Sequence, residues 1–273
     1  MQINSWYRKI EGGVHIHKCL ALEQASVAIH GFSGRVGGIS AAPYDTLNLA
    51  LHVGDDQEHV QENRRRFGNA VGLDHTNLVS ADQPHGRSVA VVTEADIGKG
   101  AADFSTAIQG VDVLLTRVRG PVLSLHFADC VPVFLVDSVQ KAVGVVHAGW
   151  KGTTIDVAGA AVQGMVEAFG SAPADIVAAI GPAIGRCCFE ADRDVVESLA
   201  AAGGGDSRVI SGGAQGVLRA EVKLVNWLQL VRAGLHEGNV FVSQECTCCN
   251  AREFFSYRRD DETGRMSAWI ALV

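Results

Sequence analysis

Two neighbouring segments constrain the fold of this chain more than any others: HFADCVPVFLVD at positions 126–137 and VGVVHAGWKGT at positions 143–153. Each holds a run of branched apolar residues of strand length, and positions 138–141 provide a turn between the two runs. We therefore expect two buried strands, 131–136 and 142–146. Cys130 and His147 lie 17 residues apart at the ends of these strands, a span over which a strand pair brings the two side chains together.

The remaining elements predict a mixed architecture. Apolar runs indicate strands, and apolar residues with helical spacing indicate amphipathic helices. The expected strands are 27–32, 88–93, 111–116, 122–126, 176–180, 240–242 and 266–272, and the expected helices are 55–71, 153–169, 192–202 and 221–235. Because strands and helices do not alternate strictly, we expect an α+β sandwich with mixed sheets. No repeat or long linker divides the chain, which predicts a single domain over 1–273.

Three local details follow from the same patterns. In the helix at 153–169 we expect an inward face formed by Ile155, Val162, Met165, Val166 and Phe169, and we expect Gly170 to end the helix. The glycine-rich segment 31–38 predicts a turn rather than a phosphate cradle, because no Gly-Lys-Ser/Thr follows it. The glycine-rich segment 203–216 is the best candidate for a loop or flap over a site.

Composition and charge limit the class of protein and the partners that it can bind. Apolar residues make up 47% of the chain and charged residues 19%, which predicts a sizeable core. The formal net charge of −7 argues against a nucleic-acid or anionic-membrane surface. No apolar run is long enough for a transmembrane helix, and the N-terminus lacks a secretory signal. Seven cysteines are an odd number in a chain that is too long to need disulfide bonds, which favours a reducing cytoplasm. We also expect a monomer, because no amphipathic segment is left over for an interface.

Candidate metal ligands gather around the strand pair. Cys130 and His147, with His85 in the turn Gln83–Gly86, offer one thiolate and two imidazoles, a set that suits zinc with one open position. Asp129 can orient a ligand or shuttle a proton. His126 shares a strand face with Cys130, but about 13 Å of extended backbone separates them, so we do not expect both on one metal.

Other histidine and cysteine groups give weaker signals. In the segment 246–249, Cys-Thr-Cys-Cys, adjacent cysteines would point in opposite directions on a strand, and no second pair follows at zinc-finger spacing. The pair Cys187-Cys188 gives an even weaker signal, so we expect no structural zinc at either place. For His15-x-His17, a strand with one polar face is favoured over a metal pair.

Nine strings together resemble one family, the YfiH family, also called polyphenol oxidase laccase-domain proteins. The similarity runs from about His30 to the C-terminus and leaves positions 1–18 outside the pattern. The strings are FSGRVGGIS (32–40), LNL (47–49), ENR (62–64), QPHG (83–86), ADCVP (128–132), HAGWKGT (147–153), GPAIG (181–185), CT (246–247) and FFSYRRDDETGR (254–265). Departures from the family pattern include Pro84 and Lys151.

The resemblance implies a four-layer α/β/β/α fold and a zinc site whose ligands match His85, Cys130 and His147. It also implies phosphorolysis of purine nucleosides (adenosine, inosine, guanosine and methylthioadenosine) together with adenosine deamination. For the phosphate we expect cationic donors, since arginine binds phosphate in a bidentate fashion. The candidates are Arg258, Arg259, Lys151 and Arg35.

Two other functions remain open. A copper phenol oxidase can use a His2Cys set, but none of the three methionines flanks a candidate ligand, and only one H-x-H pair exists among ten histidines. A metal-free cysteine hydrolase would use Cys130 as nucleophile and His147 as base.

Overall fold

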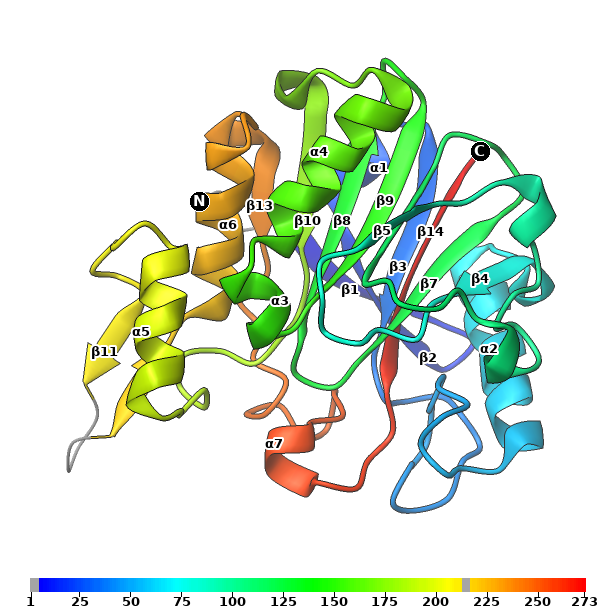
Figure 1. The fold of residues 1–273 in the computed structure, drawn as a ribbon. Helices are drawn as coiled ribbons and strands as arrows, with labels where there is room; N and C mark the ends of the chain where they lie inside the picture. The colour runs from blue at the N-terminus through cyan, green and yellow to red at the C-terminus, as the bar shows by residue number, and fades with distance from the viewer. Residues whose placement is uncertain (1–4, 213–216) are drawn as a thin grey trace.

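The computed structural model describes residues 5–212 and 217–273, in which two six-stranded mixed sheets form the centre (Figure 1). The first sheet has the order β1-β2-β3-β14-β7-β4 and the second the order β13-β10-β8-β9-β6-β5. In spatial order, the first consists of β1 (Trp6–Glu11), β2 (Val14–Cys19), β3 (Ala28–Ser33), β14 (Met266–Leu272), β7 (Val122–Phe127) and β4 (Leu78–Ser80). The second consists of β13 (Val240–Val242), β10 (Ile176–Ile180), β8 (Val131–Asp137), β9 (Ala142–Ala148), β6 (Val113–Thr116) and β5 (Val89–Val91).

Helices cover the two outer faces. The helices are α1 (Leu20–Gln24), α2 (Gln57–Val71), α3 (Trp150–Thr154), α4 (Val157–Phe169), α5 (Arg193–Ala202), α6 (Val222–Arg232) and α7 (Tyr257–Asp260). Helix α2 packs on β2 and β3, whereas α4 and α6 pack on the second sheet, and β7 and β14 face β9 across the middle. These contacts confirm the four-layer α/β/β/α sandwich. No helix in the described part of the chain is long and apolar enough to cross a bilayer.

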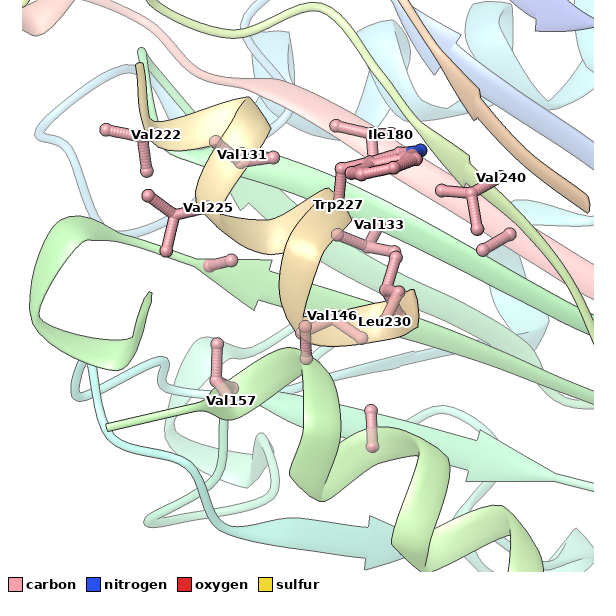
Figure 2. Close-up of a cluster of buried hydrophobic side chains, with 14 of the residues drawn as sticks. Val131, Val133, Val146, Val157, Ile180, Val222, Val225, Trp227, Leu230 and Val240 are labelled. Atoms are coloured by element: carbon pink, nitrogen blue, oxygen red, sulfur yellow. The ribbon is translucent and has the colours of Figure 1, made fainter. Parts of the chain in front are cut away.

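Each interface between layers has its own hydrophobic cluster. The buried strand pair β8 and β9 contributes alternate residues to two of them: Val133 faces the helices, and Phe134 faces the other sheet. This alternation explains why both strands read as continuous apolar runs, since both faces are buried. Figure 2 shows the helix side, where Trp227 and Leu230 of α6 lie against strand residues that include Ile180.

The predicted helix at 153–169 is divided in two. Asp156 adopts a left-handed backbone conformation (φ 65°), and its carboxylate accepts the Gly159 N–H, so it ends the first turn and caps α4. The expectation that Ile155 and Val166 face inward was wrong, since they are 46% and 39% exposed. The reason is the new start at Val157, after which the buried stripe follows positions 157, 158, 161, 162, 165 and 169. Gly170 ends the helix in the left-handed conformation, as predicted.

The glycine-rich segments differ from each other in what they do. In the segment 31–38, a Cβ on Gly38 would collide with the Thr46 carbonyl oxygen, so close backbone packing supports the turn interpretation. In the second, β11 (Ile210–Gly212) pairs antiparallel with β12 (Leu218–Ala220), so part of the predicted loop is a two-stranded ribbon. Positions 213–216 of that segment lie outside the described residues.

A buried carboxylate joins the N-terminal hairpin to the C-terminal part of the chain. His15 and His17 lie on β2, as the strand interpretation predicts, and their ring nitrogens lie 2.8 Å and 2.7 Å from the two oxygens of Glu253. Arg8 of β1 adds a third bond at 3.0 Å. Burial raises the pKa of Glu253, but the two histidines outweigh burial and lower that pKa to about 2.

We therefore predict that Glu253→Gln destabilises the protein by about 1.5–3 kcal/mol at neutral pH, the usual range for hydrogen bonds to charged groups. Because the pKa is lower in the folded state than in the unfolded chain, ionised Glu253 stabilises the fold fully above about pH 4.5, and this contribution disappears as the pH falls towards 2. Urea unfolding at several pH values checks this. The exposed Glu11→Gln serves as control, and a wild-type-minus-variant difference that is undiminished at pH 2 would contradict the assignment.

Candidate metal centre

The register of β8 and β9 brings the thiol and one imidazole to the same end of the second sheet. Val131 pairs with Ala148 and Pro132 with His147, and Cys130 directly precedes Val131. The expectation that this strand pair unites Cys130 and His147 is therefore confirmed. His85 reaches the same place from the turn before β5, where its backbone is left-handed (φ 66°).

The three side chains form one group. One ligand atom from each of His85, Cys130 and His147 lies within 4.8 Å of the others, and Cys130 Sγ is 3.9 Å from His85 Nε2. Ordinary Zn–N and Zn–S lengths place the atoms of a tetrahedral site roughly 3.3–3.8 Å apart, so small side-chain movements suffice to close the group around an ion. His126 is not part of this group, as the sequence predicts.

A buried acid that the sequence analysis did not single out, Asp112, holds two of the three candidate ligands. His147 Nδ1 lies 2.8 Å from Asp112 Oδ1, and the same carboxylate accepts the backbone N–H groups of His85 (3.1 Å) and Gly86 (2.6 Å). With Nδ1 as donor to Asp112, the Nε2 lone pair of His147 is free to bind a metal. The only sequence signal for Asp112 was a single acid at the start of an apolar run.

The sequence predicted two possible roles for Asp129, orienting a ligand or moving a proton. The hydrogen bonds of Asp129 do not support the first role. Its two carboxylate oxygens accept the Thr247 hydroxyl (2.6 Å), the Ser256 hydroxyl (2.9 Å) and the Arg258 backbone N–H (2.7 Å). These bonds attach the C-terminal segment that ends in α7 to the residue just before Cys130. Of the two acids, Asp112 has the orienting role, because its carboxylate bonds to the ring of His147 and that of Asp129 bonds to Thr247, Ser256 and Arg258.

The electrostatics of the group suit metal binding. Burial raises the pKa of the Cys130 thiol, but His147 and His85 outweigh burial and lower that pKa to about 6. Burial lowers the pKa of His147, but Cys130 and Asp112 outweigh it and raise that pKa to about 9. Cys130 is therefore a thiolate at neutral pH, and a cation that bound here would replace the proton on His147.

The close approach at the centre needs a glycine. A Cβ on Gly149 would lie 2.6 Å from His85 Cδ2 and 3.3 Å from Cys130 Sγ, so a larger residue in the HAGW turn would displace the candidate ligands. Two imidazoles, a thiolate, an orienting carboxylate and this small cradle fit a metal ion. His85, Cys130 and His147 can thus hold one.

The centre opens into a cavity of about 390 Å³, a size typical of small-molecule sites. Besides His85 and Cys130, its lining includes Trp150, Phe189 and Tyr257. These aromatic rings come from α3, from the segment after β10 and from α7.

The four predicted phosphate donors divide into two pairs. Lys151 and Arg258 line the cavity. Arg259 donates to the carbonyl groups of Thr247, Cys248 and Phe254, and Arg35 donates to those of Asp45 and Ala251. Neither Arg259 nor Arg35 lines the cavity, so the structure brings only the first pair to the centre.

Comparison with known proteins agrees with this geometry. A relative from Geobacillus stearothermophilus, named purine nucleoside phosphorylase YlmD, is 42% identical over 248 residues, which are 89% of this chain and 89% of that protein. Adenosine deaminase RL5, from an unknown prokaryotic organism, is 37% identical over 227 residues, 83% of this chain and 86% of that protein. The crystal structure of YlmD from Geobacillus stearothermophilus matches with a TM-score of 0.92 at 39% identity and covers 98% of both chains.

The family model described as "Multi-copper polyphenol oxidoreductase laccase" matches residues 29–273, the same part of the chain that carries the quoted strings. The match begins after β2, so the first hairpin lies outside it. The resemblance to YfiH proteins is thereby confirmed, and the chain belongs to the multi-copper polyphenol oxidoreductase laccase family.

Proposed function

We propose that this chain is a zinc-dependent purine nucleoside phosphorylase that also deaminates adenosine. The observation that carries the proposal is the group His85–Cys130–His147 at the wall of a cavity that is partly aromatic and partly cationic. One relative is named purine nucleoside phosphorylase and another is named adenosine deaminase, which supports the proposal. We also propose that the protein acts on small molecules, because its acidic net charge does not suit nucleic acid. We further propose that it is a cytoplasmic monomer.

The cavity offers aromatic rings for a purine and cationic side chains for phosphate. The rings of Trp150, Phe189 and Tyr257 provide apolar faces on which a purine can stack. Lys151 and Arg258 supply positive charge for an oxyanion. In phosphorolysis a phosphate oxygen forms a bond to C1′ of the ribose while the glycosidic bond breaks, and the purine leaves with the bonding electrons.

The metal site supplies the second part of the chemistry. When bound, zinc would polarise an oxygen ligand and lower the pKa of water, which suits addition of the water oxygen to C6 of adenine and loss of the amino group as ammonia. Asp112 fixes the ring orientation of His147. Cys130 Sγ lies 3.9 Å from His85 Nε2. Asp129 remains our candidate for moving a proton, but its carboxylate also accepts the backbone N–H of Arg258, which lines the cavity.

Product analysis tests the proposed reactions directly. We predict that zinc-loaded protein incubated with adenosine releases adenine and ribose 1-phosphate only when phosphate is present, and releases inosine with or without it. Chromatography of the nucleoside, base and sugar phosphate gives the measurement. Adenosine that survives both conditions, in protein that retains zinc at His85, Cys130 and His147, would rule the proposal out.

The role of Asp112 gives a second prediction. Asp112→Asn removes the charge that holds His147 and is expected to weaken zinc binding about 10- to 100-fold, the usual cost of losing the acid behind a histidine ligand. Competition with a chromophoric chelator measures the affinity. The matched control is Asp137→Asn at the other end of β8, which should leave the affinity unchanged; an unaltered zinc affinity in Asp112→Asn would show that Asp112 does not support the centre.

The cavity cations give a third prediction. Replacing Lys151 by Met, or Arg258 by Lys, should raise the KM for phosphate about 10- to 100-fold, since a hydrogen bond to a charged group contributes about 1.5–3 kcal/mol. Steady-state kinetics at varied phosphate and fixed adenosine measure this. Lys141→Met, in the β8–β9 turn at the far end of the strands, is the control. If both cavity variants keep the wild-type KM for phosphate, the anion binds elsewhere.

One alternative rests on a specific observation. Without a metal, the arrangement of Cys130, His147 and Asp112 is that of nucleophile, base and orienting acid in cysteine hydrolases. The lowered pKa of Cys130 agrees with this arrangement. Full activity after complete removal of metal by a chelator would favour this hydrolase. A copper oxidase has less support, because the groups of metal-binding side chains found among the described residues include no second histidine cluster.

A further inference from the structure

A second cluster of thiols lies outside the centre just described. Cys187 and Cys188 follow β10, whereas Cys246 and Cys249 follow β13, and one sulfur from each lies within 4.8 Å of the others. Cys249 Sγ is 3.3 Å from both Cys187 Sγ and Cys188 Sγ. The sequence expectation of no structural zinc considered each segment alone and is not supported by this arrangement, because the fold brings the two pairs together.

The spacing of the sulfurs suits one ion rather than a cluster of several. Four thiolates at the usual Zn–S length of about 2.3 Å lie roughly 3.8 Å apart in a tetrahedron. The observed separations, from 3.3 Å to at most 4.8 Å, bracket that value. A cluster of several irons would attach the cysteines to different metals and hold their sulfurs farther apart.

The backbone around these thiols has three features that suit metal binding. Cys246 and Cys249 have C-x2-C spacing in a turn, in which the Asn250 N–H donates to the Cys246 carbonyl at 3.1 Å. The Gly185 N–H donates to Cys246 Sγ at 3.2 Å. An isolated bridge between Ala183 and Cys246 fixes the two segments to each other. Such N–H donors to sulfur stabilise a thiolate, which is the form that binds a metal.

The neighbouring Cys248 marks the limits of the group. It belongs to none of the metal-binding groups of the described chain, although, like Cys188 and Cys246, it packs against the hydrophobic cluster on the helix side of the second sheet. Of the adjacent pair Cys248-Cys249, only Cys249 therefore belongs to the four-thiol cluster, whereas both members of the pair Cys187-Cys188 belong to it. Cys187 and Cys249 are exposed, so an ion has access from solvent.

We propose that Cys187, Cys188, Cys246 and Cys249 bind a single structural zinc ion through four thiolates. A site with four protein ligands has no open position, so its role is to hold segments together rather than to react. Both segments reach the cavity. Arg258 Nη1 donates to the carbonyl of Cys188 at 2.9 Å, and the Thr247 hydroxyl donates to Asp129 at 2.6 Å. The ion thereby fixes the wall that carries Phe189 and Arg258.

Metal content per chain tests the proposal, with cobalt as a spectroscopic substitute for zinc. We expect two zinc ions per wild-type chain purified under reducing conditions and loaded with zinc, and one in the double variant Cys187→Ser/Cys249→Ser. The matched control Cys248→Ser should keep two. In a Cys130→Ser variant the remaining ion should be one that, replaced by Co²⁺, shows the intense absorption of a centre with four sulfur ligands.

The Cys130→Ser variant keeps the test decisive if the double variant fails to fold, because all four proposed ligands are intact in it. Loss of all zinc and of the four-sulfur cobalt spectrum in Cys130→Ser would overturn the proposal. So would a wild-type chain that, with all seven thiols reduced, takes up only one zinc and loses that zinc in the Cys130→Ser variant. A Cys187–Cys249 disulfide, found by mass spectrometry in protein prepared under reducing conditions, would overturn it as well.

Discussion

The candidate centre depends on one buried carboxylate. Asp112 lies just before β6, and its hydrogen bonds reach the ring of His147 on β9 and the backbone of the turn that carries His85. The Asp112 carbonyl also accepts the His147 backbone N–H at 2.8 Å, so main chain and side chain hold the same residue. Burial alone would raise the pKa of Asp112, but His147 and the N–H donors of the turn keep it below the usual value, and the carboxylate stays charged. A group that is both buried and ionised must be fully bonded, which makes its partners' positions well defined.

The remainder of the site is assembled around that point from segments distant in the sequence. Asp129 performs the corresponding task on the other side of Cys130, since its oxygens bind Thr247, Ser256 and the backbone of α7. Two acids therefore flank the thiol: Asp112 fixes the His147 imidazole and the backbone of the His85 turn, and Asp129 fixes the wall with Arg258. This division explains why an aspartate next to a cysteine in the sequence need not act on the metal ligands.

Patterns along the chain predicted the strands well, because β8, β9 and β10 are buried on both faces and read as uninterrupted apolar runs. They also identified the candidate ligands, since thiol and imidazole groups at strand ends are rare. What they could not predict depends on tertiary contact. The partner of His147 comes from 35 residues away, and the four-thiol cluster joins positions about 60 residues apart. Each cysteine pair looked unpromising because its complement lay elsewhere in the chain.

The two proposed reactions place a demand on the cavity that the geometry makes specific. Phosphorolysis occurs at C1′ of the ribose, at the glycosidic bond, whereas deamination occurs at C6, on the purine ring farther from that bond. A single metal centre can serve both reactions only if the nucleoside binds in two orientations, or if the metal takes part in one reaction and Lys151 and Arg258 direct the other. A cavity of about 390 Å³ with aromatic walls suits the first case, because stacking on a ring depends little on which edge of the purine faces the metal. Phosphate bound at the two cations would then occupy space beside the centre and favour the orientation that presents C1′, so that phosphate itself would set the balance between the two reactions.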